Sequence, residues 1–257
     1  MGGDVSHVAV GDEVTTLPAF SMNDYGLYGE LVLAPSHAVV EKLPSLSFEE
    51  AVAIWSPFVT PWGAFAETHP LTADDVVAIT AASSGVGLGA IQVARSLDAT
   101  AIALTRTKAK KDQLLKAGAD HVVVTDDEDL SAGILRITHS KGASVVFDAV
   151  GGPNFVKLID AMAPGGTLWV YGRLSEEVTP LPMLAMLSKQ IVIRGYNTSG
   201  ITTTPNRQAE AVKFVYEGIT SGKLKVTVAQ IFPFDQIVEA HRALEGNKHV
   251  GKIVVTM

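Results

Sequence analysis

The sequence predicts an α/β fold: a doubly wound, parallel, six-stranded sheet with helices on both faces, joined to a smaller and partial β domain. Three observations predict it. From about residue 74 onward, short apolar runs rich in β-branched residues alternate with helical patterns, which is typical of βαβ units. These runs are almost continuously apolar, as expected for strands that are buried on both faces. Both ends of the chain instead contain short strand-like runs with turn signals.

Six apolar runs are the expected strands of the parallel sheet. They are residues 76–80, 100–105, 121–125, 144–150, 167–172 and 191–196. Helical patterns separate the first five runs, at about residues 86–97, 107–120, 129–142 and 153–166. Gly118 is a helix stop signal, Asp129 is the expected N-cap of the third helix, and Pro153 lies near the start of the fourth.

The change from alternating strand and helix patterns to short strand-like runs predicts the domain boundaries. We expect residues 47–221 to form the domain with the parallel sheet, with helical stretches at 47–69 and about 206–221. Residues 1–46 and 222–257 are expected to form a second, discontinuous domain. Its last segment has the pattern of a strand, a helix and a strand, and we expect this segment to fold back onto the first 40 residues.

The composition excludes several classes of function. The 257 residues carry a formal net charge of −7, and no stretch is dense in Lys and Arg, so neither nucleic acid nor an anionic membrane surface is an expected partner. The chain has no cysteine, which excludes disulfides, thiolate nucleophiles and cysteine-containing zinc sites, and is compatible with a cytoplasmic location. The scattered histidines predict no metal site. No apolar run reaches the roughly 18 residues of a membrane span.

One turn carries the strongest functional signal. Residues 79–95 have the sequence ITAASSGVGLGAIQVAR. The spacing Gly85-x-Gly87-x-x-Ala90 follows a strand directly and opens a helix, as the dinucleotide-binding fingerprint requires. Gly85 is expected to permit the tight turn, Gly87 to let the backbone approach a pyrophosphate, and Ala90 to let helix and strand pack closely. The N–H groups at the helix N-terminus would bind the phosphates. A close-packed turn without a ligand is the alternative.

The residues after the second strand indicate which dinucleotide is bound. NAD requires a carboxylate at this place for the ribose hydroxyls, but the chain has Thr105-Arg106-Thr107. We predict that Arg106 and Lys110, with Lys108 and Lys111 beside them in the sequence, offer cations to a 2′-phosphate, so NADP(H) is the expected cofactor. The alternative is that these lysines form only the solvated start of a helix.

Several separated motifs occur together in this chain. They are AASSGVGLGAIQVAR, FDAVGG, MAPGGTLWVYGRLS, the ending FPFDQIVEAHRALEGNKHVGKIVVTM and, near the start, VGDEV. In this order they resemble the zinc-independent quinone oxidoreductase branch of the medium-chain dehydrogenase/reductase superfamily, over essentially the whole chain. The resemblance implies that a Rossmann domain and a GroES-like barrel bind NADPH between them, and that a hydride passes to a quinone or an α,β-unsaturated carbonyl compound.

The resemblance also implies roles for individual residues. Lys110 matches the lysine on the 2′-phosphate, and Thr60 matches a threonine beside the nicotinamide, although a packing role for its hydroxyl is an equal alternative. Val150, Gly172 and Arg173 match positions at the carboxyl ends of the fourth and fifth strands, which face the cofactor. The residues matched to the pyrophosphate are Ser84, Gly85, Val86 and Gly87.

The chain departs from the family pattern in two places. Thr125, followed by the acidic run DDED, stands where many relatives have a tyrosine that faces the adenosine phosphate. The several tens of residues that the family has before VGDEV, which include a loop at the nicotinamide, are not part of this sequence. An NADP(H)-binding or sensing module without turnover is therefore the alternative function. A zinc alcohol dehydrogenase of the same superfamily would require cysteine ligands.

Hydride transfer places few demands on the protein's own acid–base chemistry, because the nicotinamide carries the hydride. A hydrogen bond to the acceptor carbonyl would stabilise the developing enolate. Candidates for this bond are Tyr25, Tyr28, Thr60 and Arg173. The last apolar run, residues 191–196, is expected to be an uncovered sheet edge through which two copies of the chain pair as a homodimer.

Overall fold

The computed structural model of the protein describes residues 2–3 and 5–257. It divides into two compact units: one is Pro61–Asn197, and the other combines the chain up to Thr60 with Thr198–Met257. The sequence predicts the boundaries at residues 46/47 and 221/222. In the structure, the helical segments 47–60 and 198–221 are instead grouped with the chain ends. No helix among the described residues is long and apolar enough to cross a membrane.

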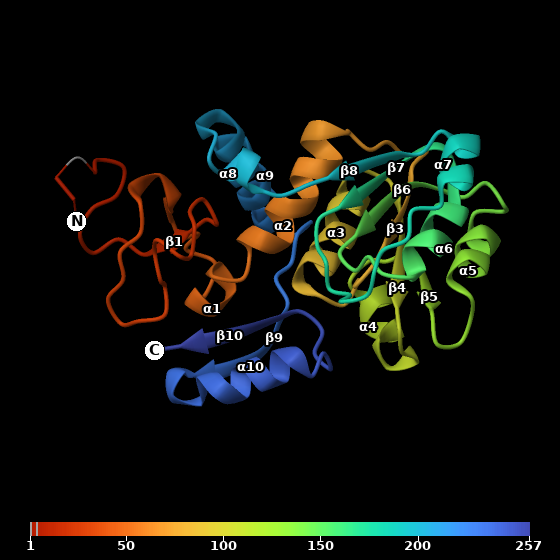
Figure 1. Cartoon of the computed structure of the whole chain (residues 1–257). Helices are drawn as coiled ribbons and strands as arrows, with labels where there is room; N and C mark the ends of the chain where they lie inside the picture. The colour runs from red at the N-terminus through yellow and green to blue at the C-terminus, as the bar shows by residue number, and fades with distance from the viewer. Residues whose placement is uncertain (1, 4) are drawn as a thin grey trace. The chain divides into compact units, whose positions relative to one another are not determined.

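The unit Pro61–Asn197 contains a parallel six-stranded sheet in the order β5-β4-β3-β6-β7-β8 (Figure 1). Each predicted strand is present, which confirms the Rossmann-like fold class. The strands are β3 (Val76–Ile79), β4 (Thr100–Thr105), β5 (His121–Val124), β6 (Ala143–Asp148), β7 (Met162–Val170) and β8 (Val192–Gly195). The chain builds outward from β3 to β5 and then returns to place β6 on the other side of β3. The carboxyl ends of β3 and β6 therefore form the topological switch point, where such sheets bind ligands.

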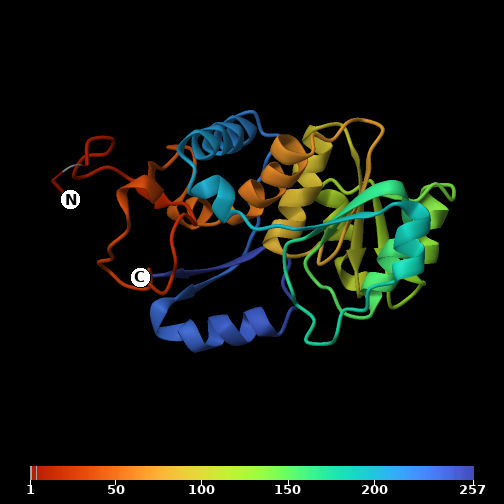
Figure 2. The same cartoon turned by 45° about the horizontal axis from the view of Figure 1, so that its top comes forward.

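Helices cover both faces of this sheet, with α3 on one face and α5, α6 and α7 on the other (Figure 2). The Asp129 carboxylate caps α5 by accepting a hydrogen bond from the Ala132 N–H at 3.1 Å, as the sequence predicted. The helices are α3 (Gly85–Ser96), α4 (Lys111–Lys116) with the 3₁₀ turn η3 (Lys108–Lys110) before it, α5 (Leu130–Ile137), α6 (Asn154–Asp160) and α7 (Met183–Lys189).

Several elements differ from their predicted lengths. The helix after Pro153 ends at Asp160, and β7 begins at Met162 rather than at residue 167. β7 starts early because Met162 pairs with Ala143 of β6. The register then shifts, so that the next pair is Val145 with Thr167 and the residues between Met162 and Thr167 have no partner in β6. The segment expected to be helical from 47 to 69 is divided into α1 (Phe48–Ala51), α2 (Trp55–Trp62) and a π-helical turn η2 (Gly63–Thr68). Pro61 inside α2 has no N–H to donate, and the irregular turn follows it.

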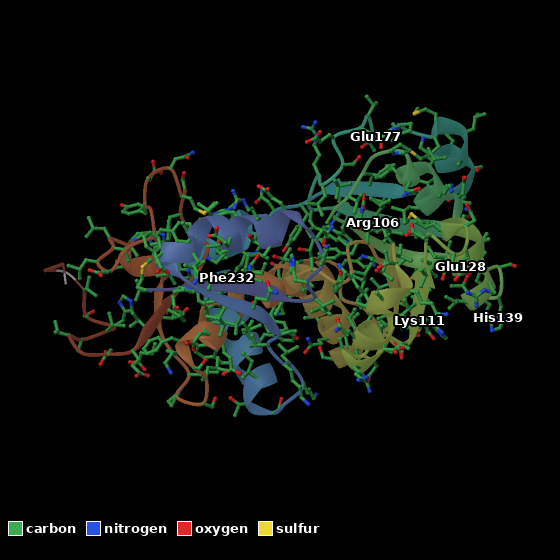
Figure 3. All side chains as sticks on the ribbon, turned by 90° about the horizontal axis from the view of Figure 1, so that it is seen from below. Arg106, Lys111, Glu128, His139, Glu177 and Phe232 are labelled. Atoms are coloured by element: carbon green, nitrogen blue, oxygen red, sulfur yellow. The ribbon has the colours of Figure 1, made fainter. Side chains whose placement is uncertain are left out.

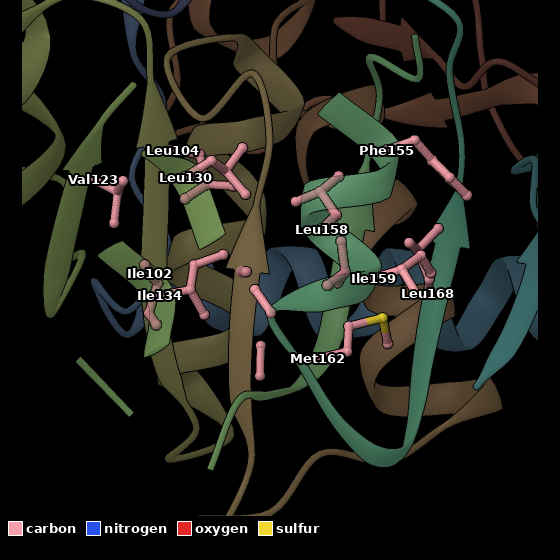
Figure 4. Packing of buried hydrophobic residues seen from close by; sticks show 14 of the residues in the cluster. Ile102, Leu104, Val123, Leu130, Ile134, Phe155, Leu158, Ile159, Met162 and Leu168 are labelled. Atoms are coloured by element: carbon pink, nitrogen blue, oxygen red, sulfur yellow. The ribbon is translucent and has the colours of Figure 1, made fainter. Parts of the chain in front are cut away.

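Apolar side chains between the sheet and its helices form the core of this unit (Figure 4). Ile134 from α5 and Leu158 from α6 pack there against strand residues such as Ile102 and Leu168, and all four are at most 1% exposed. On the opposite face the Phe147 ring packs edge-on against Phe65 from η2, with 4.8 Å between centroids. Burial on both faces explains why the strands are continuously apolar.

The second unit contains two small sheets. β1 (Val14–Thr16) and β2 (Val39–Glu41) pair antiparallel, while β9 (Val228–Pro233) and β10 (Lys252–Thr256) pair parallel. The strand, helix and strand predicted at the end are thus present, with α10 (Ile237–Glu245) between the strands. The terminal strands pair with each other, and no described residue among the first 40 joins their sheet. The remaining helices are α8 (Ser199–Thr202) and α9 (Pro205–Thr220), with the 3₁₀ turn η1 (Ser36–Ala38) before β2 and η4 (Phe234–Gln236) before α10.

Candidate functional site

The turn from β3 into α3 is built from hydrogen bonds of its own residues. The Ser84 N–H donates to the Ala81 carbonyl oxygen at 2.9 Å, and Ala81 has a positive φ of 45°. Ser84 is the N-cap of α3, because its hydroxyl oxygen accepts a hydrogen bond from the Gly87 N–H at 3.0 Å. One of the amides expected to bind phosphate is therefore already bonded to the protein.

Packing within the turn requires a glycine at position 87. A Cβ on Gly87 would lie 2.5 Å from the Ala81 carbonyl oxygen and 2.6 Å from the Ala82 Cα. The missing side chain thus makes room for the backbone of the same turn, a requirement that holds with or without a bound phosphate. Gly85, in contrast, is the first residue of α3.

Two amides of the first helical turn have the geometry to bind an anion. The N–H groups of Gly85 and Val86 lie at the first two helical positions, where an α-helix has no internal acceptor for them. They have no bonded acceptor in the part of the chain that the structure describes. A helix N-terminus also carries a partial positive charge, so these two amides can hold a phosphate.

Basic side chains lie next to this turn. The Lys110 Nζ donates a hydrogen bond of 3.0 Å to the Ser83 hydroxyl, which connects η3 to the glycine turn. Partial burial, and then the nearby Arg106 guanidinium, lower the pKa of Lys110. Arg106 is exposed directly after β4, and Figure 3 labels it together with Lys111 at the start of α4. The structure therefore brings Arg106 and Lys110 together, which the sequence spacing alone did not require.

The chain after β5 runs beside this basic group. The Thr125 N–H donates to the Thr105 carbonyl oxygen at 2.8 Å, and the Asp126 N–H donates to the Arg106 carbonyl oxygen at 3.1 Å. The segment that begins the acidic run DDED is thus paired with the backbone that carries Arg106. Thr125 stands at the position expected to face the adenosine end of a dinucleotide.

A buried carboxylate organises the switch point, and the sequence analysis did not single it out. The Asp148 side chain, with 0% of its surface exposed, accepts hydrogen bonds from the Thr80 hydroxyl at 2.7 Å, the Val150 N–H at 3.0 Å and the Gly151 N–H at 2.9 Å. The Thr80 hydroxyl oxygen in turn accepts from the Ala149 N–H at 2.9 Å. A charged residue at the end of a buried strand, as in FDAVGG, was the available signal.

Val150 and Gly172 lie side by side at the carboxyl edge. The Ser175 N–H donates to the Val150 carbonyl oxygen at 2.9 Å, and a Cβ on Gly172 would lie 2.9 Å from the Ala149 carbonyl oxygen. The two backbone segments are thus in close contact beyond the ends of β6 and β7. Arg173 follows Gly172 and is exposed.

Tyr171 is a second group that the sequence analysis did not use. Its ring stacks on Phe147 with centroids 3.9 Å apart, and its hydroxyl is buried without a hydrogen-bond partner among the described residues. Burial, and then the nearby Asp148 carboxylate, raise the pKa of Tyr171. The hydroxyl therefore stays protonated at physiological pH and is available only as a neutral group.

The other catalytic candidates belong to the second unit. Thr60 is 7% exposed. Its hydroxyl donates a 2.7 Å hydrogen bond to the Ser56 carbonyl oxygen inside α2. The Tyr25 ring contacts Phe20 edge-on, with 5.5 Å between centroids. Tyr28 is 66% exposed. The Thr60 contact is the local bond that a packing hydroxyl makes, although its oxygen can still accept another.

The sequence of this chain matches a known protein family and several characterised relatives. A family model described as zinc-binding dehydrogenase matches residues 117–255. A 2-haloacrylate reductase of Burkholderia sp. is 27% identical over 267 residues, which cover 99% of this chain and 77% of that protein. The chain spans about three quarters of the length of the curated relatives that it matches first, 76% and 77%.

Solved structures share the fold over most of the chain. A crystal structure of Escherichia coli quinone oxidoreductase complexed with NADPH has a TM-score of 0.81 and 29% identity, covering 86% of this chain and 69% of that one. An NAD-dependent alcohol dehydrogenase has a TM-score of 0.80 and 31% identity, covering 88% of this chain and 64% of that one. The neighbours thus include proteins described with either nicotinamide cofactor.

The donor set of this chain does not fit the zinc ion in the family's description. Zinc in proteins is bound by three or four Cys, His or carboxylate groups in close proximity. The chain has no cysteine, and no group of three His, Asp or Glu side chains that could hold a metal occurs among the described residues. No step of the chemistry is therefore assigned to zinc.

Proposed function

The chain belongs to the zinc-binding dehydrogenase family, in the quinone oxidoreductase branch of the medium-chain dehydrogenase/reductase superfamily, and from this premise we propose that it is an NADPH-dependent oxidoreductase. Its substrate would be a small quinone or α,β-unsaturated carbonyl compound that accepts a hydride. The names of its relatives, a quinone oxidoreductase and a 2-haloacrylate reductase, support this substrate class.

The observation that carries the proposal is the placement of Lys110 beside the glycine turn. Its ammonium lies 3.0 Å from the Ser83 hydroxyl, next to a helix N-terminus with two available N–H groups. A dinucleotide phosphorylated on its adenosine ribose presents two anionic groups, the pyrophosphate and the 2′-phosphate. We assign the pyrophosphate to Ser84, Gly85, Val86 and Gly87 and the 2′-phosphate to Lys110 and Arg106.

The geometry of Ser84 and Gly87 adds a detail to the pyrophosphate site. The Gly87 N–H is bonded to the Ser84 hydroxyl oxygen, so it would act on phosphate through that hydroxyl. A hydroxyl that accepts one hydrogen bond still has its own hydrogen to donate. Ser84 would therefore donate to a phosphate oxygen while it caps α3, and the amides of Gly85 and Val86 would donate directly.

The remaining residues would orient the nicotinamide and the substrate. The cofactor supplies the hydride, so the protein must hold the two reacting carbons close together and exclude water. Val150 and Gly172 lie at the carboxyl edge next to the switch point, and we assign them to the nicotinamide end. A hydrogen bond from Tyr25 or Arg173 to the acceptor carbonyl would stabilise the negative charge that develops on its oxygen, and Thr60 could donate one only after its hydroxyl leaves the Ser56 carbonyl oxygen.

A titration combined with a turnover assay tests the proposal. We expect the purified chain to bind NADPH more tightly than NADH, and to oxidise NADPH when a quinone or an enone is added, followed by the loss of reduced-nicotinamide absorbance. Equal affinities for the two cofactors would contradict the assignment of the 2′-phosphate site. NADPH binding without turnover on any acceptor would support the alternative function, a binding or sensing module.

Matched variants separate the roles of individual residues. Lys110→Met should weaken NADPH binding, whereas Lys116→Met removes an exposed lysine in the last turn of α4 and should not. Among the catalytic candidates, Thr60→Val, Tyr25→Phe and Arg173→Gln each remove one donor. Replacement of the residue that polarises the carbonyl should lower kcat and leave the Kd for NADPH unchanged.

We also propose that the protein is a homodimer. β8 is the last strand in the sheet order, so one of its edges has no strand beside it in the described part of the chain. Val192 on this strand is 44% exposed, and Leu184 and Leu187 on α7 are 84% and 69% exposed. An apolar strand edge of this kind favours pairing with the same strand of a second copy.

A further inference from the structure

We propose that Ser83 is a positioning residue that gives the site its preference for a phosphorylated dinucleotide, by holding the Lys110 ammonium in place before the cofactor binds. This inference rests on the proposed function and extends it to a residue outside the glycine spacing. Ser83 precedes the N-cap of α3 in the turn, and its hydroxyl accepts the hydrogen bond from the Lys110 Nζ at 3.0 Å.

The bond joins two elements that come from different parts of the chain. Ser83 lies in the turn after β3, whereas Lys110 ends the 3₁₀ turn after β4, 27 residues further on. A lysine side chain has four flexible bonds and normally samples many positions. Fixing its ammonium at one hydroxyl removes much of this freedom in the free protein, so less freedom is lost when the phosphate arrives.

The chemistry of the partner matters as much as its position. A carboxylate partner would neutralise the ammonium and compete with a phosphate for it. The Ser83 hydroxyl is neutral, so this bond itself places no negative charge beside the Lys110 ammonium. Partial burial and the neighbouring Arg106 lower the pKa of Lys110.

The Ser83–Lys110 bond lies near the N-terminus of α3, which explains why the preference for NADPH over NADH would depend on it. Ser83 is adjacent to Ser84, which caps α3, so the hydroxyl holds the ammonium close to the anion-binding amides. A cofactor whose pyrophosphate sits on those amides would then present its 2′-phosphate to a cation that is already oriented. NADH has no such phosphate, and its affinity should not depend on Ser83.

The test compares the affinity of both cofactors for four proteins. They are the wild type, Ser83→Ala, Ser83→Thr and Ser131→Ala, in which the last variant removes a partly exposed hydroxyl from α5 as a matched control. We expect Ser83→Ala to raise the Kd for NADPH roughly tenfold, because the flexible Lys110 side chain would then have to be immobilised when the cofactor binds. The Kd for NADH should stay the same, and Ser83→Thr, which keeps the hydroxyl, should retain the wild-type selectivity.

A double-mutant cycle shows whether Ser83 acts through Lys110. If it does, Ser83→Ala should have no further effect on NADPH affinity in a Lys110→Met background. Unchanged selectivity in Ser83→Ala would overturn the inference and leave the proposed function intact. Equal loss in Ser83→Ala and Ser83→Thr, or weaker binding of both cofactors, would also overturn it, because packing of the turn would then be responsible. A wild type that does not prefer NADPH would overturn the inference together with the cofactor assignment.

Discussion

The Thr80 hydroxyl donates a 2.7 Å hydrogen bond to the fully buried carboxylate of Asp148, and this bond joins the carboxyl ends of β3 and β6. These two strands meet at the switch point of the sheet. The same carboxylate accepts from the amides of Val150 and Gly151, so it shapes the turn that follows β6. A buried anion with this many donors is well compensated, whereas the donors would lose their acceptor without it.

Replacement of Asp148 should therefore destabilise the fold. Asp148→Ala leaves one hydroxyl and two amides without an acceptor, and a cost of roughly 3 kcal/mol in the free energy of unfolding is expected. Asp148→Asn keeps one carbonyl oxygen and should cost less. Urea denaturation followed by circular dichroism measures both values. The exposed Asp126, changed to Ala, is the control and should have little effect. A similar small effect for Asp148→Ala would show that water replaces the carboxylate.

Gly87 should tolerate no side chain. In Gly87→Ala the new Cβ would lie 2.5 Å from the Ala81 carbonyl oxygen, so the turn would have to move. We expect a clear loss of stability and weaker binding of NADPH and NADH alike, because the pyrophosphate amides move with the turn. Gly200→Ala is a matched control in α8, since its Cβ would have only an ordinary contact of 3.6 Å. Wild-type cofactor binding in Gly87→Ala would contradict this account.

The affinity for NADPH should decrease at alkaline pH earlier than an ordinary lysine would allow. Burial and the nearby Arg106 lower the pKa of Lys110 from the usual 10.5. Below its pKa the side chain is charged and attracts the 2′-phosphate, and above it this attraction is lost. The Kd for NADPH should therefore rise as the pH increases toward 10.5, while the Kd for NADH stays nearly constant. Isothermal titration at several pH values measures both.

The same pKa shift makes a prediction for the free protein. A lysine whose pKa is lowered on folding is less favourable in its charged form in the folded state than in the unfolded state. This unfavourable contribution is present below the folded pKa and disappears as the pH rises above the unfolded value. In Lys110→Met the loss of this contribution offsets the loss of the hydrogen bond to the Ser83 hydroxyl, so the Tm at neutral pH should stay close to that of the wild type, despite weaker NADPH binding. A large decrease in Tm would indicate that Lys110 is mainly structural.

The parallel sheet could be predicted from the sequence because its strands are buried on both faces. Runs such as HVVVT and TAIALT are then apolar without interruption, and the six runs have no competing interpretation in this context. The cap at Asp129 could be predicted for a similar reason, since it depends only on residues within one helical turn. Local patterns of this kind do not depend on the rest of the fold.

The parts that could not be predicted depend on how distant segments meet. Thr80 and Asp148 are 68 residues apart and become neighbours only because β6 pairs with β3. Ser83 and Lys110 meet only because η3 turns back toward the glycine turn. Strand-like runs are expected at the start of the chain, but the apolar residues Leu31 and Leu33 there belong to no strand, and both side chains are more than 80% exposed. A strand needs a partner, and periodicity within one segment does not provide it.

The open edge of β8 gives a prediction about assembly. A lysine on a strand edge opposes pairing with another strand, because two like charges would be brought together in the joined sheet. Val192→Lys should therefore shift the protein from dimer to monomer in sedimentation velocity experiments. Val238→Lys makes the same change on α10 at a similarly exposed position, 52% against 44%, and should leave the dimer intact. NADPH affinity should be unchanged in the Val192→Lys monomer if the phosphate sites lie within one chain. A wild type that sediments as a monomer at all concentrations would show that exposure of this edge is compatible with a single copy.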